Sequence, residues 1–141
     1  YILADADIDM ARNKPGQAAK KLARRLAVSP GSHPLTMGYA RALMKNQQPH
    51  IAAAVLVEQS KRWPDDPGLW YLLAEVQGLS GNIAGLHQSR AEYFILNGSL
   101  DDAKKQLTYA LKLTKGDYLV SAKIHQRLAD VARMQQQMDE F

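Results

Sequence analysis

The feature that most constrains this chain is a spacing of 34 residues between two prolines that follow helix-like segments. Pro30 ends the Ala-, Leu- and Arg-rich segment 18–29, and Pro64 ends the similar segment 52–63. Proline cannot continue a helix, because it lacks the backbone N–H and its ring clashes with the preceding turn. A fixed period of this size is typical of stacked supersecondary units, so the sequence predicts repeated helical hairpins.

Local signals predict where the helices begin and end. Proline suits the first helical turn, and four prolines precede stretches of apolar periodicity: Pro15, Pro34, Pro49 and Pro67. Expected N-caps are Asp66, Asn82, Ser99 and Asp117. Expected left-handed residues after helices are Gly81, Gly98 and Gly116. The predicted helices are residues 2–12, 15–28, 34–46, 49–62, 67–80, 83–97, 99–114 and 117–136.

These helices predict an all-α fold in a single domain, residues 1–141. We expect about four antiparallel hairpins, 2–28, 34–62, 67–97 and 99–136, stacked as a right-handed superhelix with a concave side. Small and large residues alternate on one face of 99–114, as in Leu100, Ala103 and Leu107, which lets a neighbouring helix approach closely. Segment 83–97 has two interpretations: counting by 34 makes it a second helix of a hairpin, whereas its sequence is typical of a first helix.

Composition excludes several classes of protein. The absence of cysteine excludes disulfide frameworks and thiolate metal sites. The longest apolar run, residues 51–57, is far shorter than the roughly 20 residues that span a bilayer, so no membrane span is predicted. The net charge of +4 is mild. A basic ridge on segment 15–28 consists of Lys20, Lys21, Arg24 and Arg25. Without interleaved aromatic residues, this ridge predicts a solvated outer face rather than a nucleic-acid site.

No pattern of catalytic or metal-binding residues is present. The H-E-x-x-H arrangement of zinc peptidases is missing, and the four histidines are scattered, which predicts surface or capping roles for His33, His50, His87 and His125. Asp5, Asp7 and Asp9 could bind a cation, but acidic residues in an opening helix more often stabilise its N-terminus. We therefore predict no enzymatic activity, no bound metal and no cofactor in these 141 residues.

Two segments carry a family resemblance. Residues 66–74, with Trp70, Leu73 and Ala74, and the linker 63–67 resemble the tetratricopeptide repeat proteins, as does the helix, glycine turn and Ala/Leu helix of 90–113. Residues 90–124 also resemble the C-terminal repeat region of bacterial periplasmic zinc metallopeptidases of the β-barrel assembly-enhancing type. Because the chain lacks an initiator Met, we expect it to be part of a longer protein.

The resemblance implies a protein-binding role and a set of groove residues. The groove positions are Leu3, Asp7, Met10, Met37, Arg41, Met44, Lys45, Tyr71, Glu75 and Leu79. Met37, Met44 and Leu79 have an equally good interpretation as core, and Tyr39, Trp63, Trp70 and Leu73 are expected within the stack. The implied partners are an extended peptide, outer-membrane assembly machinery or the protein's own catalytic domain, which could hold zinc. The implied location is the periplasm, with the cytoplasm left open. The alternative is a free-standing scaffold or co-chaperone domain.

Overall fold

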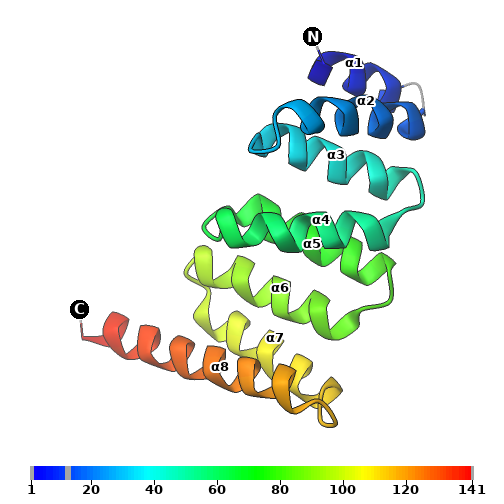
Figure 1. Cartoon of the computed structure of the whole chain (residues 1–141). Helices are drawn as coiled ribbons and strands as arrows, with labels where there is room; N and C mark the ends of the chain where they lie inside the picture. Colours follow the sequence, from blue (N-terminus) through cyan, green and yellow to red (C-terminus); the bar gives the residue numbers. More distant parts are fainter. Residues whose placement is uncertain (1, 12–13, 141) are drawn as a thin grey trace. The chain divides into compact units, whose positions relative to one another are not determined.

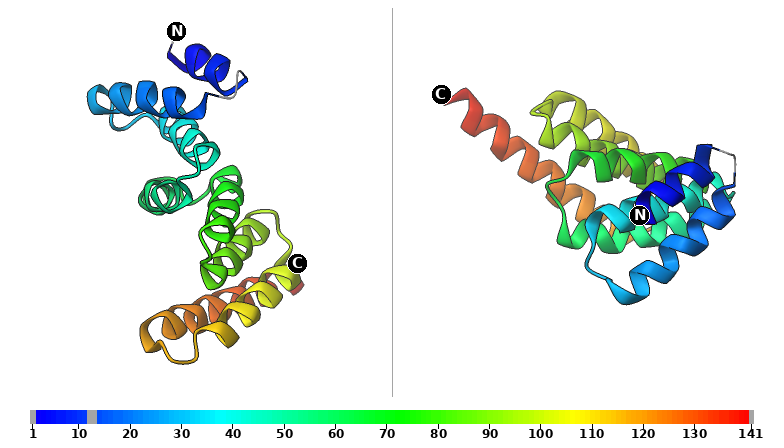
Figure 2. Two further views of the ribbon diagram at one scale, coloured as in Figure 1. Left: turned by 90° about the vertical axis from the view of Figure 1, so that its right-hand side faces the viewer. Right: turned by 90° about the horizontal axis from the view of Figure 1, so that it is seen from above.

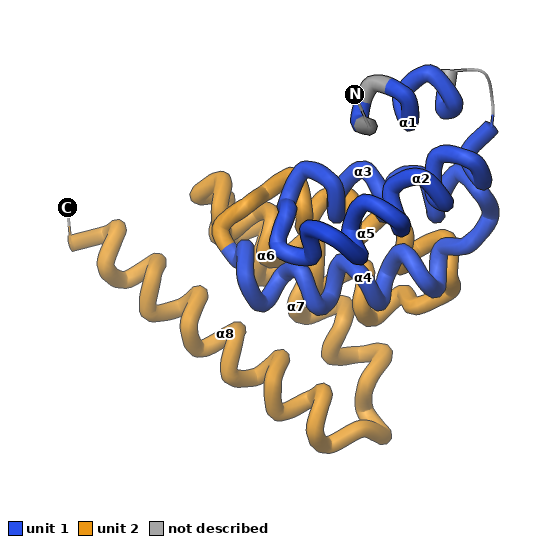
Figure 3. Tube along the Cα trace, turned by 45° about the horizontal axis from the view of Figure 1, so that its top comes forward, with its two compact units in different colours: residues 1–64 blue, residues 65–141 orange. Residues whose placement is uncertain are grey.

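The computed structural model describes residues 2–11 and 14–140, except for the side chains of residues 2, 4 and 11. Within these residues every regular element is an α-helix (Figure 1), and adjacent helices pack as in a tetratricopeptide-like solenoid. The predicted all-α solenoid is therefore confirmed. The chain divides into two compact units, residues 1–64 and 65–141 (Figure 3). The prediction of one domain with four hairpins stays a prediction.

Unit 1 contains four helices: α1 (Ile2–Ala11), α2 (Pro15–Val28), α3 (His33–Lys45) and α4 (Pro49–Arg62). Each helix packs on the next, and α1 also contacts α3. The core consists mainly of alanine and leucine, including the fully or nearly fully buried Ala18, Leu22, Ala40, Leu43, Ala52 and Leu56. Alanine at these contacts lets the helix axes approach while leucine fills the space between them.

Unit 2 contains α5 (Pro67–Leu79), α6 (Ile83–Leu96), α7 (Leu100–Leu113) and the long α8 (Tyr118–Asp139). Here α6 packs on both α5 and α7, and α7 forms an antiparallel pair with α8 (Figure 2). One core cluster joins α6, α7 and α8 and consists of Ala91, Leu100, Ala103, Leu107, Ala110, Ile124 and Val131. On α5 the side chains of Leu69, Leu72, Leu73 and Val76 are buried.

Helix limits agree closely with the prediction. The bounds of α2 and α4 are those predicted, and the other described helix ends differ by at most three residues. Residue 12, the predicted end of the first helix, lies outside the described residues. Asp66, Asn82 and Asp117 cap their helices, since each side chain accepts a hydrogen bond from a backbone N–H. The Ser99 prediction is wrong, because its side chain makes no capping hydrogen bond.

Left-handed residues follow α3, α5 and α6. Gly81 and Gly98 have φ values of +84° and +77°, as predicted. The prediction for Gly116 is wrong, because its φ is not positive. The turn there is closed by a hydrogen bond from the backbone N–H of Asp117 to the Thr114 carbonyl, which does not require a left-handed residue. Gln47, with φ +63°, takes the left-handed position after α3, 34 residues before Gly81. The 34-residue period from Gly81 therefore indicates a left-handed residue at position 47, which glutamine as a residue type does not.

One charged pair joins α1 to α2. Lys21 Nζ lies 2.7 Å from Asp9 Oδ2, and Asp9 is buried in the last turn of α1. The interpretation of Asp9 as a stabiliser of a helix N-terminus is therefore wrong, because its partner comes from the next helix. On the basic ridge Lys20, Arg24 and Arg25 are exposed, as expected for a solvated face, whereas Lys21 is half-buried beside Asp9.

Candidate peptide-binding pocket between α5 and α6

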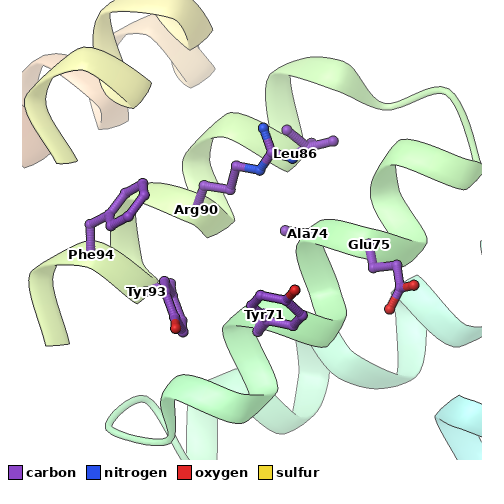
Figure 4. Close-up of a pocket in the computed structure, with 7 residues that line it drawn as sticks. All are labelled: Tyr71, Ala74, Glu75, Leu86, Arg90, Tyr93 and Phe94. Carbon is purple, nitrogen blue, oxygen red and sulfur yellow. The ribbon is translucent and has the colours of Figure 1, made fainter. Parts of the chain in front are cut away.

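An open pocket of about 260 Å³ lies between α5 and α6 (Figure 4). It is lined by Tyr71, Ala74, Glu75, Leu86, Arg90, Tyr93 and Phe94. Gly78 brings the two helices together beside it, since a Cβ at this position would lie 2.8 Å from Leu86 Cδ1. The lining is mostly apolar and aromatic with a charged group from each helix, which is the usual make-up of a binding site in a protein.

Aromatic rings form one wall of the pocket. Tyr71 from α5 and Tyr93 from α6 face one another, with ring centroids 5.5 Å apart and planes tilted by 58°. Phe94 meets Tyr93 edge to face at 5.8 Å. Tyr71 is 63% exposed, so its ring offers apolar area and a hydroxyl to solvent rather than to the core. Such a ring gives a ligand a large contact area at a low cost in conformational entropy.

The two charged residues are available to a ligand. Arg90 and Glu75 are exposed, and neither has a hydrogen bond or ion pair with another described residue. In Figure 4 the Arg90 side chain runs along α6 beside Leu86, while Glu75 extends from α5. Arginine presents a planar fork of donors that matches a carboxylate, and glutamate accepts from amines and backbone N–H groups. The pocket can therefore hold an apolar side chain and a charged group next to it.

The sequence prediction found only part of this site. Tyr71 and Glu75 line the pocket, and Leu79 lies on the same helix, 61% exposed, outside the lining. Arg90, Tyr93 and Phe94 were missed because the predicted groove drew only on the first helix of each hairpin. The spacing of Arg90 and Phe94, one helical turn apart with Tyr93 beside them, is the signal that would have found them.

In unit 1 the predicted groove residues separate by burial. Met37 is buried, which agrees with its interpretation as core. Half-buried residues are Leu3, Met10 and Met44, and exposed residues are Asp7, Arg41 and Lys45. A peptide-binding role for the ten predicted groove residues stays a prediction in both units.

Residues assigned to the stack are less uniform than expected. Leu73 is buried and Tyr39 and Trp70 are half-buried, but Trp63 is 45% exposed. Its indole stacks on the His33 ring at 4.4 Å.

Two of the four histidines are packed rather than free on the surface. The His33 ring, stacked on Trp63, also hydrogen-bonds Gln59. His87 is half-buried, hydrogen-bonds Gln106 at 2.7 Å and lies against Tyr109. His33, the first residue of α3, and His87 are thus partly covered, whereas His50 and His125 are exposed as predicted.

Metal-binding groups do not gather in the described part of the chain. Over residues 2–11 and 14–140, no three His, Asp or Glu side chains lie close enough to hold an ion. In the same residues, each helix is too short or too polar to span a bilayer.

Comparison with known sequences identifies the repeat. The sequence model of the tetratricopeptide repeat family matches residues 33–76. This segment is therefore similar to a tetratricopeptide repeat. Such repeats bind other proteins, so the match indicates protein–protein interaction and protein partners for this chain.

The chain is also similar over its length to curated proteases. It is 29% identical over 143 residues to the β-barrel assembly-enhancing protease of Escherichia coli (strain K12), covering 100% of this chain and 29% of that protein. It is 27% identical over 135 residues to the same-named protease of Yersinia pestis, covering 96% of this chain and 28% of that protein. The resemblance predicted from the sequence is thereby confirmed, and the chain spans less than a third of the length of these curated relatives.

Proposed function

We propose that this chain is a non-catalytic arm that holds extended protein segments for a zinc metallopeptidase. The proposed ligands are substrates or outer-membrane assembly partners, the proposed location is the periplasm, and zinc would belong to a catalytic domain outside these 141 residues. The observation that carries the proposal is the α5–α6 pocket, with its exposed aromatic wall and two charged groups without a described partner. The similarity to proteases that enhance β-barrel assembly supports the choice of partner.

The pocket chemistry selects among peptide ligands. An aromatic or large aliphatic side chain would pack against the exposed face of Tyr71 beside Tyr93, and a carboxylate next to it would pair with Arg90. Glu75 would repel a carboxylate on the α5 side and so favour one orientation of the peptide. Peptides that carry an aromatic residue next to an acidic group are therefore the expected ligands.

Photo-crosslinking tests the proposal. A benzoylphenylalanine introduced at Tyr71 or Tyr93 in the chain should capture such a peptide, and the same probe at Tyr109 should not. Tyr109 is a matched control, because it is 46% exposed on α7 and does not line the pocket. Equal capture from all three positions would show that binding is not at the pocket.

A charge reversal tests the role of Arg90. Arg90→Glu should weaken binding of the peptide by about tenfold or more, as expected when a charge-assisted pair becomes repulsive. Fluorescence anisotropy of a labelled peptide measures this change, and Arg24→Glu on the exposed ridge of α2 serves as control. Unchanged affinity in Arg90→Glu would contradict the assignment.

A further inference from the structure

The turn between α7 and α8 buries the polar residue Thr114 and exposes three large apolar residues. Tyr118 is 90% exposed, Leu119 78% and Leu113 57%, whereas Thr114 is buried between them in sequence. We call Leu113, Tyr118 and Leu119 the apolar turn; it joins the last two helices at the lower right of Figure 1. Apolar side chains this exposed, and this close in sequence, mark an interaction surface more often than isolated ones do.

Hydrogen bonds fix this arrangement. Thr114 Oγ1 donates to the Ala110 carbonyl at 3.1 Å, and Ser121 Oγ donates to the Thr114 carbonyl at 2.6 Å. The Asp117 carboxylate accepts from the Val120 backbone N–H at 3.1 Å and caps α8. These bonds order the backbone of the turn, on which Leu113, Tyr118 and Leu119 are exposed.

Three lysines lie near the apolar turn in sequence. Lys112, Lys115 and Lys123 are exposed near it in sequence, and Asp117, which caps α8, is the acidic residue between them. The local charge is therefore positive. Lysine reaches an anionic surface with its ammonium group while its aliphatic stem lies along apolar material.

We propose that the apolar turn and its three lysines dock this chain on an anionic lipid surface. Tyrosine and leucine at the end of a hairpin enter the boundary between headgroups and acyl chains, while nearby lysines attract anionic headgroups. Charge complementarity favours lipid whose headgroup has a net negative charge over a zwitterionic bilayer. The contact is peripheral, reversible and sensitive to salt, and it is independent of peptide binding at the α5–α6 pocket.

Site-specific labelling tests the docking. The chain has no cysteine, so Leu119→Cys and Leu79→Cys each accept a single environment-sensitive fluorophore. Leu79 is a matched control, because it is a 61% exposed leucine on α5. With vesicles of phosphatidylglycerol and phosphatidylcholine the label at 119 should shift to the blue and lose the shift in high salt. Neither label should respond to pure phosphatidylcholine.

Sedimentation with the same vesicles gives a second measurement on the unlabelled chain. The double variant Tyr118→Ser/Leu119→Ser should reduce the bound fraction by about tenfold, while Leu79→Ser should leave it unchanged. Circular dichroism checks that each variant is as helical as the parent chain. An equal shift at 79 and 119, no shift at 119, or unaltered sedimentation of the double variant would overturn the proposal. Capture of a protein through position 119 without any lipid response would do the same.

Discussion

The hairpins α3–α4 and α5–α6 share one 34-residue plan but use it in opposite ways. In unit 2, Tyr71 and Arg90 line an open pocket. The residues 34 positions earlier in unit 1, Met37 and Leu56, are buried at 6% and 0% exposure. The remaining lining residues correspond to Ala40, Arg41, Ala52, Gln59 and Ser60, of which Ala40, Ala52 and Gln59 are buried.

This difference shows that equivalent positions can be core in one hairpin and pocket lining in the other. The helices begin and end at nearly equivalent residues in both hairpins. What changes is the side chain: an arginine stands where unit 1 has a leucine, and a tyrosine where it has a methionine. Under the proposed function, binding at the pocket depends on a few side chains that differ between two hairpins of the same backbone plan.

The largest expected effect is a difference in the free energy of unfolding between alanine variants of Leu56 and Arg90. Leu56→Ala should lower the free energy of unfolding by about 2–5 kcal/mol, because it leaves a cavity in a packed core. Arg90→Ala, at the equivalent position, should change it by no more than about 0.5 kcal/mol, because the side chain is exposed. Urea titration of both variants measures the two values, and similar losses would mean that the two hairpins are not used differently.

A second comparison concerns Glu58 and Glu92, again 34 residues apart. Glu92 accepts two hydrogen bonds of 2.8 Å from Arg127 and so fastens α6 to α8. Among the described residues Glu58 pairs only with Lys61, on its own helix, and both side chains are largely exposed. Glu92→Ala should cost about 1–3 kcal/mol of stability, and Glu58→Ala about 0.5 kcal/mol or less. Urea titration measures these losses, and Arg127→Ala should cost at least as much as Glu92→Ala, because Arg127 also hydrogen-bonds Asp130.

The smallest effect is a pH dependence confined to unit 2. Hydrogen bonds from Arg127, and then from Gln126, hold the pKa of Asp130 below its ordinary value, and the charge of Arg127 acts in the same direction. Because the folded pKa is the lower one, this stabilisation is present above about pH 4 and is lost as the pH falls through the folded pKa. Its size is about 1 kcal/mol or less.

Urea midpoints from about pH 6 to pH 2 measure this dependence. Asp130→Asn should flatten the acid limb of the profile, while Asp65→Asn, at an exposed position between α4 and α5, should leave it unchanged. A profile of Asp130→Asn that still falls like that of the parent chain would contradict the assignment.

The helices could be predicted from the sequence because their ends depend on local chemistry. Pro15 and Pro49 begin helices, and Asn82 and Asp117 cap them, through atoms within three residues. Ser99 was predicted wrongly although its backbone N–H bonds to the Phe94 carbonyl just as that of Asn82 bonds to the Gln77 carbonyl; the Asn82 side chain caps its helix and the Ser99 side chain does not.

The candidate site could be predicted only in part, because it depends on contacts between helices. Lys21 and Asp9 are twelve residues apart and meet only when α2 packs on α1. Tyr93 on α6 forms part of the pocket wall only because its ring faces that of Tyr71 on α5. Neither the period of 34 nor amphipathicity indicates which outward residues of one helix face those of another.

The two turns at Gly81 and Gly98, which lie before and after α6, are equivalent. Gly81 and Gly98 make the same bonds, with the next N–H donating to the carbonyl five residues back, at Gln77 and Phe94, each at 2.9 Å. The segment between the turns is one helix rather than a hairpin. Removing residues 82–98 would join Gly81 directly to Ser99, keep one such turn, and delete Arg90 and Tyr93 together. The unit that carries the α6 side of the pocket is therefore a single helix with its turn.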